Sequence, residues 1–271
     1  MDSPVFSETP LLKQLHGKAV QQLGTSGSGN HFVEFGSVRL YEGNELGYPG
    51  GEYLGLLSHS GSRGLGATVA RHYTDLAQKD CLLPKHVQHL AWLDMNSDAG
   101  REYWLSMNLA GDYAKACHDQ IHYHLSHYLG LDSILTVENH HNFAWREKGP
   151  NGEEVIVHRK GATPAAKGEL GIIPGSMATN GYIVRGKGEA SSLNSASHGA
   201  GRKMSRSKVK NCYTKSALNK YLSQERVTLI GGGVDEAPIA YKNIDEVMAS
   251  QKELVDIIGE FKPMMVRMDK G

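Results

Sequence analysis

The sequence predicts a mixed α+β fold built as a single domain, and three observations lead to this prediction. Segments with apolar residues at helical spacing alternate with short apolar segments of strand type. The chain has 271 residues, which is long enough to bury a substantial core. No internal repeat, low-complexity tract or clear linker interrupts it. We therefore expect residues 1–22 to form a lead-in segment with a short helix, and residues 23–271 to form one domain.

The first half of the chain alternates helix and strand. The strongest helical signal lies in residues 96–129, where apolar residues including Trp104, Met107 and Cys117 recur at intervals of three and four. A glycine-rich loop at residues 24–30 leads into the first strand. The expected helices are residues 11–23, 65–79 and 96–129, and the expected strands are residues 31–35, 53–58 and 133–138.

The second half is expected to be richer in strands. Residues 142–158 read as a hairpin around a turn at 148–152. In residues 245–258 the spacing of Val247, Leu254, Val255 and Ile258 predicts a helix. The remaining expected elements are strand-like pieces within 170–184, a helix that starts in 203–210 and a closing strand at 261–268.

Charge and cysteine content limit the class of protein. The chain has 29 Lys and Arg and 29 Asp and Glu, so its net charge of zero argues against nucleic-acid binding driven by overall positive charge. Residues 202–210 nevertheless form a local basic run. Three cysteines without a C-x-x-C spacing argue against a disulfide framework and favour a reducing compartment. Because we find no signal peptide and no long apolar segment, we expect a cytoplasmic protein.

Four of the 14 histidines lie in glycine- and serine-rich segments, away from ordinary helix or strand patterns. They are His31, His59, His141 and His198. Imidazole is both a common metal ligand and a competent nucleophile near neutral pH. Glycine beside it lets a phosphate or a metal approach the backbone closely. The pattern therefore predicts a site that holds a divalent metal and a polyphosphate together.

The surroundings of His198 suit a nucleophile that attacks phosphorus. Small neighbours leave room for a bulky partner, and Arg202 is placed to bind phosphate oxygens bidentately. A histidine attacking phosphorus would form a covalent phosphoramidate and divide a difficult transfer into two easier ones. The alternative is a turn histidine that caps the following helix.

The other three histidines are metal candidates, because each ends or follows an expected strand. Three imidazoles suit Zn, Mn, Co or Fe better than Ca or Mg. The alternative for each is an ordinary hydrogen-bonded histidine, and spacing does not decide between His140 and His141. Two further turns suit anions, residues 174–179 and residues 158–163, although an ordinary turn and a solvated strand end remain the alternatives.

Eight blocks of the sequence occur in a recognisable order. They are residues 27–34, 58–66, 141–142, 157–163, 174–178, 197–202 and 235–238, followed by the terminal pair Lys270 and Gly271. Together they resemble the RtcB family of RNA-splicing ligases. The resemblance runs from about Leu23 to Gly271 and is far more specific than a single motif.

The resemblance implies an RtcB-like fold and an enzyme, a 3′-phosphate/5′-hydroxy nucleic acid ligase. Such a ligase joins RNA 3′-phosphate or 2′,3′-cyclic phosphate ends to 5′-hydroxyl ends. It uses GTP and Mn²⁺ and passes through a guanylylated histidine. The implied partners are RNA ends, either tRNA halves in splicing or broken RNA in repair.

Carried over by motif, His198 is the residue that takes GMP, and His31, His59 and His141 are manganese ligands. Glu34 would bind the guanine edge, Lys270 would contact the base and Tyr241 would stack near it. The implied GMP pocket comprises Asn30, Phe32, Glu34, Asn142, Gly175, Ser176, Met177, Gly199, Ala200, Gly201, Tyr241 and Lys270. The implied RNA and phosphate contacts are Arg63, Arg159, Lys160 and Arg202, with Lys203 and Arg206 at the same groove.

One departure from the family pattern concerns the metal site. Family members carry an upstream Asp and Cys in an Asp-x-Gly-x-Gly-x-x-Cys-like context, whereas no cysteine here precedes Cys81. We therefore expect an N-terminally incomplete member: a truncated gene product, an excised fragment, or half of a split protein whose partner polypeptide supplies these two ligands. Reduced Mn²⁺ affinity and impaired ligation by this chain alone are expected.

Three functions are consistent with the sequence. The first is the ligase or its catalytic part. The second is a truncated or degenerate paralogue that binds GMP or RNA ends without ligating them. The third is a metal-dependent phosphohydrolase that uses the same histidines.

Overall fold

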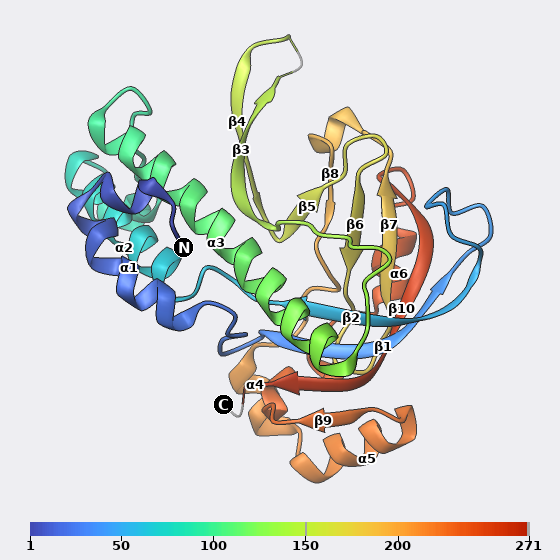
Figure 1. Ribbon diagram of the computed structural model, residues 1–271. Coiled ribbons are helices and arrows are strands. Elements are labelled where there is room, and N and C mark those ends of the chain that lie inside the picture. Colours follow the sequence, from blue (N-terminus) through green and yellow to red (C-terminus); the bar gives the residue numbers. More distant parts are fainter. Residues whose placement is uncertain (150, 270–271) are drawn as a thin grey trace. The chain divides into compact units, whose positions relative to one another are not determined.

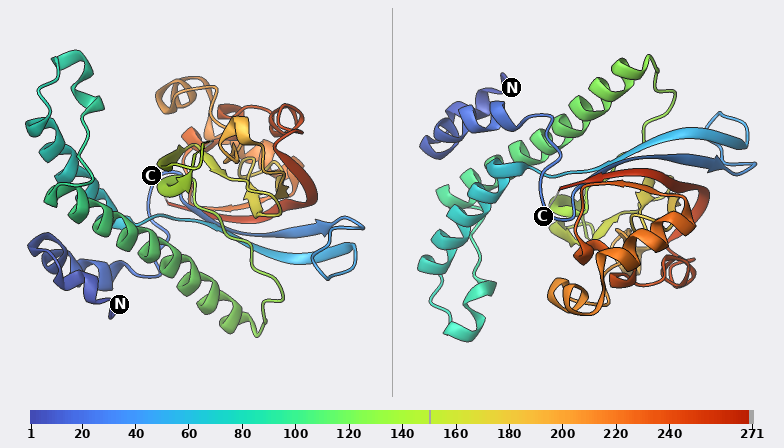
Figure 2. Two further views of the ribbon diagram at one scale, coloured as in Figure 1. Left: turned by 90° about the horizontal axis from the view of Figure 1, so that it is seen from above. Right: turned by 90° about the horizontal axis from the view of Figure 1, so that it is seen from below.

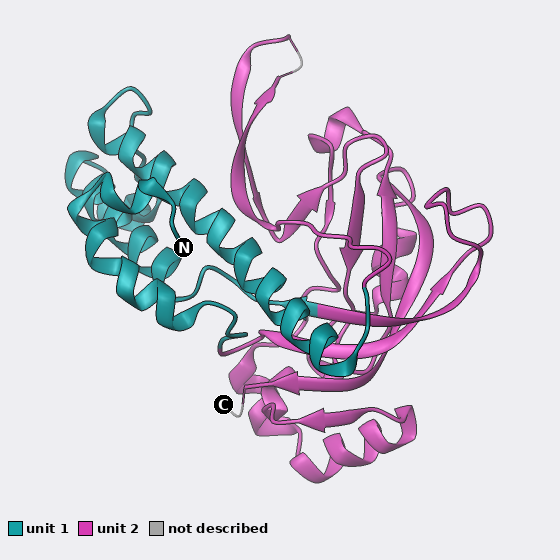
Figure 3. Ribbon diagram, viewed as in Figure 1, with its two compact units in different colours: residues 1–27, 58–132 teal, residues 28–57, 133–271 magenta. Residues whose placement is uncertain are grey.

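The computed structural model describes residues 1–149 and 151–269 (Figure 1). Helices and antiparallel sheets together confirm the predicted α+β class. The chain divides into two compact units (Figure 3). Unit 1 comprises Met1–Gly27 and Ser58–Asp132, and unit 2 comprises Ser28–Leu57 and Ser133–Gly271.

Unit 1 is helical, and its three α-helices begin and end close to the predicted residues. They are α1 (Pro10–Gln22), α2 (Arg63–Asp80) and α3 (Asp98–Leu129), with short 3₁₀ turns η1 (Pro4–Ser7) and η2 (Lys85–Leu90). The Ser97 hydroxyl caps α3 by accepting a hydrogen bond from the Gly100 N–H at 3.0 Å. Leu12, Leu65 and Cys117 are almost fully buried where the three helices meet.

Unit 2 is built on a six-stranded sheet. Its strands follow the order β2-β1-β10-β7-β6, and β9 pairs in parallel with β10. In Figure 2 the blue β1 and the red β10 run side by side, in agreement with their antiparallel register from Phe32↔Met268 to Leu40↔Gly259. The strands are β1 (Phe32–Leu40), β2 (Gly51–His59), β6 (Leu170–Ile173), β7 (Gly181–Gly186), β9 (Thr228–Ile230) and β10 (Val255–Met268).

Two small antiparallel pairs stand beside this sheet in unit 2. The predicted hairpin is confirmed as β3 (Asn142–Lys148) and β4 (Glu154–Lys160), and it projects from the rest of the unit (Figure 1). The second pair joins β5 (Ala162–Pro164) to β8 (Ser195–Ser197). The helices of this unit are α4 (Arg206–Cys212), α5 (Lys215–Glu225) and α6 (Ile244–Ala249), and its 3₁₀ turns are η3 (Ala190–Ser192), η4 (Val234–Glu236) and η5 (Pro238–Ala240).

Two predicted elements are wrong. The helix predicted at 245–258 ends at Ala249, and Val255 begins β10, where Val255 and Ile257 pair with Gly186 and Val184. A helical spacing of apolar residues was thus produced by two different elements, since β-branched residues also suit a buried strand. The strand predicted at 133–138 is irregular backbone. Sequence analysis also missed α5 and the short strands β5, β8 and β9.

Among the helices of residues 1–149 and 151–269, none is both long enough and apolar enough to span a membrane.

Candidate active site

His198 follows β8 directly, and the β5–β8 pairing fixes its surroundings. Ala162 pairs with Ser197, which brings Gly161 beside the imidazole ring of His198. Gly161 adopts a φ of +71°, and a Cβ at this position would lie 3.6 Å from Cε1 of His198. That distance is an ordinary van der Waals contact, so it is the left-handed φ that favours glycine at 161.

His141, another of the four predicted histidines, lies beside His198. Its carbonyl accepts a hydrogen bond from the Gly161 N–H at 3.0 Å. The rings of His141 and His198 stack with centroids 5.0 Å apart and planes inclined by 22°. Two histidines that lie 57 positions apart in the sequence are thus brought into contact by the turn at Gly161.

Burial controls the protonation of His198. Burial lowers the pKa of His198 below its ordinary value, and the backbone of Gly161 offsets part of this effect. The Nδ1 atom of His198 is buried and has no hydrogen-bond partner among the described residues. The ring is therefore neutral at pH 7 and keeps a nitrogen lone pair, as a nucleophile requires.

Hydrogen bonds of ordinary length hold the turn that carries His198. The Ser197 N–H donates to Oε1 of the buried Gln251 at 2.9 Å, and the Ser197 hydroxyl donates to the Gly199 carbonyl at 2.7 Å. The Ala200 N–H donates to the Pro174 carbonyl at 3.2 Å, and a Cβ on Gly199 would lie 3.1 Å from that same oxygen. These contacts attach the turn to the predicted anion loop at residues 174–179.

In that loop Gly175 has no space for a side chain, because a Cβ would lie 2.3 Å from the Asn180 carbonyl oxygen. The hydroxyl groups of Ser176 and Thr179 lie 2.9 Å apart within hydrogen-bond distance. Met177 is buried in an apolar cluster against which Phe32 and Tyr241 also pack. The structure therefore brings Phe32, Met177 and Tyr241, three predicted GMP-pocket residues, into one cluster.

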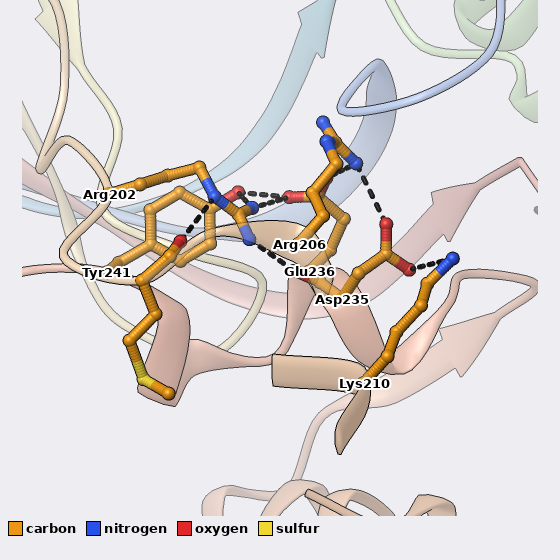
Figure 4. A network of polar contacts seen from close by, with 7 residues as sticks. Arg202, Arg206, Lys210, Asp235, Glu236 and Tyr241 are labelled. Atoms are coloured by element: carbon orange, nitrogen blue, oxygen red, sulfur yellow. Dashed lines mark hydrogen bonds and ion pairs between the residues drawn. The ribbon is translucent and has the colours of Figure 1, made fainter. Parts of the chain in front are cut away.

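Arg202 leads from the His198 turn into a buried polar network (Figure 4). Its guanidinium lies over the Tyr241 ring, 5.2 Å from the centroid, and donates to Glu236 at 3.0 Å and to the Asp235 carbonyl at 2.7 Å. Glu236 is 3% exposed and also accepts a hydrogen bond from the Tyr241 hydroxyl. Burial and the Glu236 carboxylate together raise the pKa of Tyr241, which keeps the phenol protonated.

Further cations complete this network. Arg206 forms ion pairs with both Glu236 and Asp235, and Lys210 lies 3.7 Å from the Asp235 carboxylate (Figure 4). Burial opposes ionisation of Asp235, but the hydrogen bond from Arg206 and the charge of Lys210 outweigh it and lower the pKa of Asp235. Arg202 and Arg206 are thus held by carboxylates of this chain, although sequence analysis placed both at an RNA groove.

Glu34 lies in β1 opposite Val266 of β10 and is 4% exposed. Burial raises the pKa of Glu34 from 4.5 to about 8, so at pH 7 the carboxyl group is mostly protonated. A buried neutral carboxyl beside an apolar cluster has both a donor and an acceptor for a ligand.

This pKa predicts how stability depends on pH. Between pH 4.5 and pH 8 the folded chain holds a proton on Glu34 that the unfolded chain releases. The contribution of Glu34 to the free energy of unfolding is therefore complete below pH 4.5 and falls as pH rises toward 8, by up to about 1.4 kcal/mol per pH unit. We expect Glu34→Gln to lose less stability than the wild type between pH 6 and pH 8 in urea titrations. Parallel pH profiles for the two proteins would contradict this assignment.

The predicted manganese ligands are divided between the two units. His31, just before β1, and His141 belong to unit 2, whereas His59 ends β2 in unit 1. Among the described residues, no three His, Cys, Asp or Glu side chains gather closely enough to hold a metal ion. Two of the three predicted ligands, His31 and His141, belong to the same unit, and by themselves they are an incomplete ligand set for Mn²⁺.

The remaining predicted residues of the GMP pocket differ in solvent exposure and in backbone role. Asn30 and Asn142 are exposed, and Asn142 starts β3 directly after His141. Gly201 has a φ of +71°, and its carbonyl accepts from the Lys242 N–H at 2.9 Å. Lys270 lies outside the described residues.

Of the predicted RNA contacts, Arg63 and Lys160 are accessible and Arg159 is not. Arg63 begins α2 in unit 1 and donates to the Thr25 hydroxyl at 3.1 Å, whereas Lys160 is exposed at the end of β4. Arg159 is 3% exposed, makes a bidentate pair with Glu147 at 2.5 and 3.0 Å, and lies over the Trp145 ring. Its position gives it a structural role in the hairpin.

Removing Arg159 should therefore affect stability. We expect Arg159→Ala to lower the free energy of unfolding by about 2–4 kcal/mol, because the Glu147 carboxylate loses its partner. Its exposed neighbour Lys160 is the matched control, and Lys160→Ala should change stability by less than about 0.5 kcal/mol. Equal effects of the two substitutions in urea unfolding would show that Arg159 is not a structural residue.

Sequence analysis missed three residues that form the site. Glu236 lies in a recognised block but was given no role, and Gly161 and Gln251 act through backbone and amide contacts with the His198 turn. Glycine at the end of a strand was a usable signal for Gly161. Nothing local in the sequence indicates Gln251, which acts across 54 positions.

Comparison with known proteins places these motifs in one family. The family model described as tRNA-splicing ligase RtcB matches residues 6–269. The chain is 35% identical over 254 residues to the RNA-splicing ligase RtcB of Escherichia coli K12, covering 88% of this chain and 59% of that protein. It is 34% identical over 284 residues to the tRNA-splicing ligase RtcB of Nanoarchaeum equitans, covering 90% of this chain and 59% of that protein.

A third relative, the tRNA-splicing ligase RtcB of Thermococcus kodakarensis, is 29% identical and is matched over 92% of this chain and 60% of its own length. The chain thus spans less than two thirds of the length of these relatives. The family model runs through both compact units. The match therefore extends well beyond the His198 motif, and the chain belongs to the tRNA-splicing ligase RtcB family.

Proposed function

We propose that this chain carries the guanylyl-accepting centre of a GTP- and Mn²⁺-dependent RNA ligase, with His198 as the nucleophile. The ligase joins RNA 3′-phosphate or 2′,3′-cyclic phosphate ends to 5′-hydroxyl ends. The observation that supports the proposal best is the state of His198. Its ring is held neutral by burial, stacks on His141 and keeps Nδ1 without a hydrogen-bond partner among the described residues.

The first chemical step follows from that state. A ring nitrogen of His198 attacks the α-phosphorus of GTP, a P–N bond forms, and the bond to pyrophosphate breaks. The ring then loses its remaining N–H proton to solvent, which leaves a neutral imidazole ring on an anionic phosphoramidate. The turn at residues 197–201 supplies the small residues that leave space for the phosphate, and its hydrogen bonds hold the ring before attack.

Guanine recognition is assigned to the apolar cluster near Glu34. Phe32 and Tyr241 pack against the same cluster and offer flat surfaces for a base. A carboxylate at Glu34 would accept hydrogen bonds from the guanine edge, so binding favours the ionised form of this buried group. The resemblance also assigns a contact with the base to Lys270, which lies outside the described residues.

His31, His59 and His141 are proposed as ligands of Mn²⁺. When bound, Mn²⁺ neutralises phosphate charge. We also propose that a partner polypeptide supplies the Asp and Cys ligands of the family motif. Adding Mn²⁺ should then raise the melting temperature less for this chain alone than for the chain with that partner.

Radiolabelling tests the proposed function. The chain is incubated with α-³²P-GTP over a range of Mn²⁺ concentrations, denatured and analysed by gel electrophoresis. We expect a covalent label that is lost in acid and retained in alkali, as expected of a phosphoramidate. The absence of label at every Mn²⁺ concentration, or an acid-stable label, would contradict guanylyl transfer to histidine by this chain.

A binding module is the second candidate, and one observation favours it. Because the described residues hold no three-ligand metal group, this chain alone has less metal chemistry than a complete ligase needs. Such a module would bind GMP or RNA ends without forming the covalent bond. Calorimetric binding of GMP without any radiolabel would identify it.

A further inference from the structure

A pocket of about 630 Å³ lies in unit 2 beside the segment that carries His198. Ser197, the residue before His198, forms part of its wall. Two lysines, Lys203 and Lys242, line the same pocket from two different segments. This volume is in the range of small-molecule sites and would hold about one nucleotide unit.

The local backbone explains why both lysines face this pocket. Arg202 and Tyr241 form an isolated antiparallel bridge, flanked by hydrogen bonds from Lys203 N–H to the Ala240 carbonyl and from Lys242 N–H to the Gly201 carbonyl. Side chains alternate between the two faces of extended backbone. Arg202 and Tyr241 therefore share the face of the buried network, while Lys203 and Lys242 project from the opposite face.

The charge of the pocket favours an anion. In contrast to Arg202 and Arg206, neither lysine forms an ion pair with any residue the structure describes. Glu246 is the one acidic residue among those that line the pocket. Two cations against one carboxylate leave a net positive charge at neutral pH.

The other lining residues suit the remaining parts of a nucleotide. The Asn243 Oδ1 atom accepts from the Asp245 N–H at 2.9 Å, and its amide nitrogen still carries two N–H donors for a ligand. Ser250 adds a hydroxyl group. Val247 and Leu254 add apolar surface on which a base can lie.

We propose that this pocket binds the sugar–phosphate backbone of a single-stranded RNA end, with Lys203 and Lys242 on the phosphates. The choice of RNA rests on the proposed function, whereas the preference for a phosphate-bearing ligand rests on the two lysines. The pocket shares Ser197 with the His198 turn, so a strand held there lies next to the guanylyl-accepting segment. Because the whole chain has no net charge, such a local pair of cations decides where an RNA backbone binds.

Fluorescence anisotropy with a fluorescein-labelled single-stranded RNA that ends in a 3′-phosphate, at several KCl concentrations, tests the proposal. We expect Lys203→Gln/Lys242→Gln to bind about tenfold more weakly at about 0.1 M salt. The slope of log K against log[KCl] should fall by about 1.4, since each lost phosphate contact removes about 0.7. The control Lys252→Gln removes a lysine that does not line the pocket, and it should bind as the wild type does.

A variant that gains affinity provides a second test, because misfolding can explain a loss of RNA binding but not a gain. Glu246→Gln removes the acidic lining residue, so it should bind RNA two- to threefold more tightly. Unchanged affinity in the double variant, an equal loss in Lys252→Gln, or no RNA binding by the wild type would each overturn the proposal. The radiolabelling experiment tests the proposed function separately: if that function is wrong, the wild-type chain acquires no label from GTP.

Discussion

Replacing His198 with asparagine is expected to abolish covalent guanylylation, with a loss on the order of 10³-fold or more. Asparagine has no lone-pair nitrogen that can attack phosphorus, so the covalent intermediate cannot form. The fold should survive, because His198 is only half-buried and its Nδ1 atom has no hydrogen-bond partner among the described residues. Gel autoradiography after incubation with α-³²P-GTP and Mn²⁺ measures the loss, and circular dichroism confirms the fold.

The matched control is His158→Asn. His158 is an exposed histidine of β4 in the same unit, opposite Ala144 of β3. It should leave the label at the wild-type level. Full labelling of His198→Asn would assign the nucleophile to another residue.

Glu236→Ala is expected to have the largest effect on stability, a loss of about 3–5 kcal/mol in the free energy of unfolding. The Glu236 carboxylate is almost fully buried. It forms ion pairs with Arg202 and Arg206 and accepts a hydrogen bond from the Tyr241 hydroxyl. Removing it leaves two guanidinium groups and a partly buried phenol without their shared acceptor. Urea unfolding followed by circular dichroism measures the change.

Two controls separate charge from geometry in this network. Glu236→Gln keeps an acceptor for the Tyr241 hydroxyl but loses the ion pairs, so its loss of stability should be intermediate. Glu154→Ala removes the partner of Arg146 in an exposed pair at 2.9 Å and should cost less than about 1 kcal/mol. A Glu236→Ala protein as stable as Glu154→Ala would show that the network does not support the fold.

The helices of unit 1 were predictable because their apolar periodicity is long and uninterrupted. The helix α3 that carries the pattern is 32 residues long and ends before Gly130, whose left-handed φ of 66° suits a helix terminus. The helix prediction for residues 245–258 failed because α6 is only six residues long, and Val255 and Ile258, which extend its apolar spacing, belong to β10. Short elements carry too few residues for periodicity to separate helix from strand.

At the site, the sequence could identify reactive residue types but not their partners. His198 and His141 were both predicted, and the contact between their rings depends on a turn at Gly161. Arg159 and Arg202 were predicted at an RNA groove, because a sequence does not show that Glu147 and Glu236 lie beside them. Pairing across 12 and 34 positions is decided by tertiary structure, so cationic residues near a motif are poorly assigned from sequence.

We propose His198 as the residue that accepts GMP. Tandem mass spectrometry of the protein digested at alkaline pH, after incubation with GTP and Mn²⁺, identifies the modified residue. The predicted result is a single GMP adduct on His198 in the peptide that contains residues 197–202. An adduct on a lysine or on another histidine, with His198 unmodified, would contradict the claim.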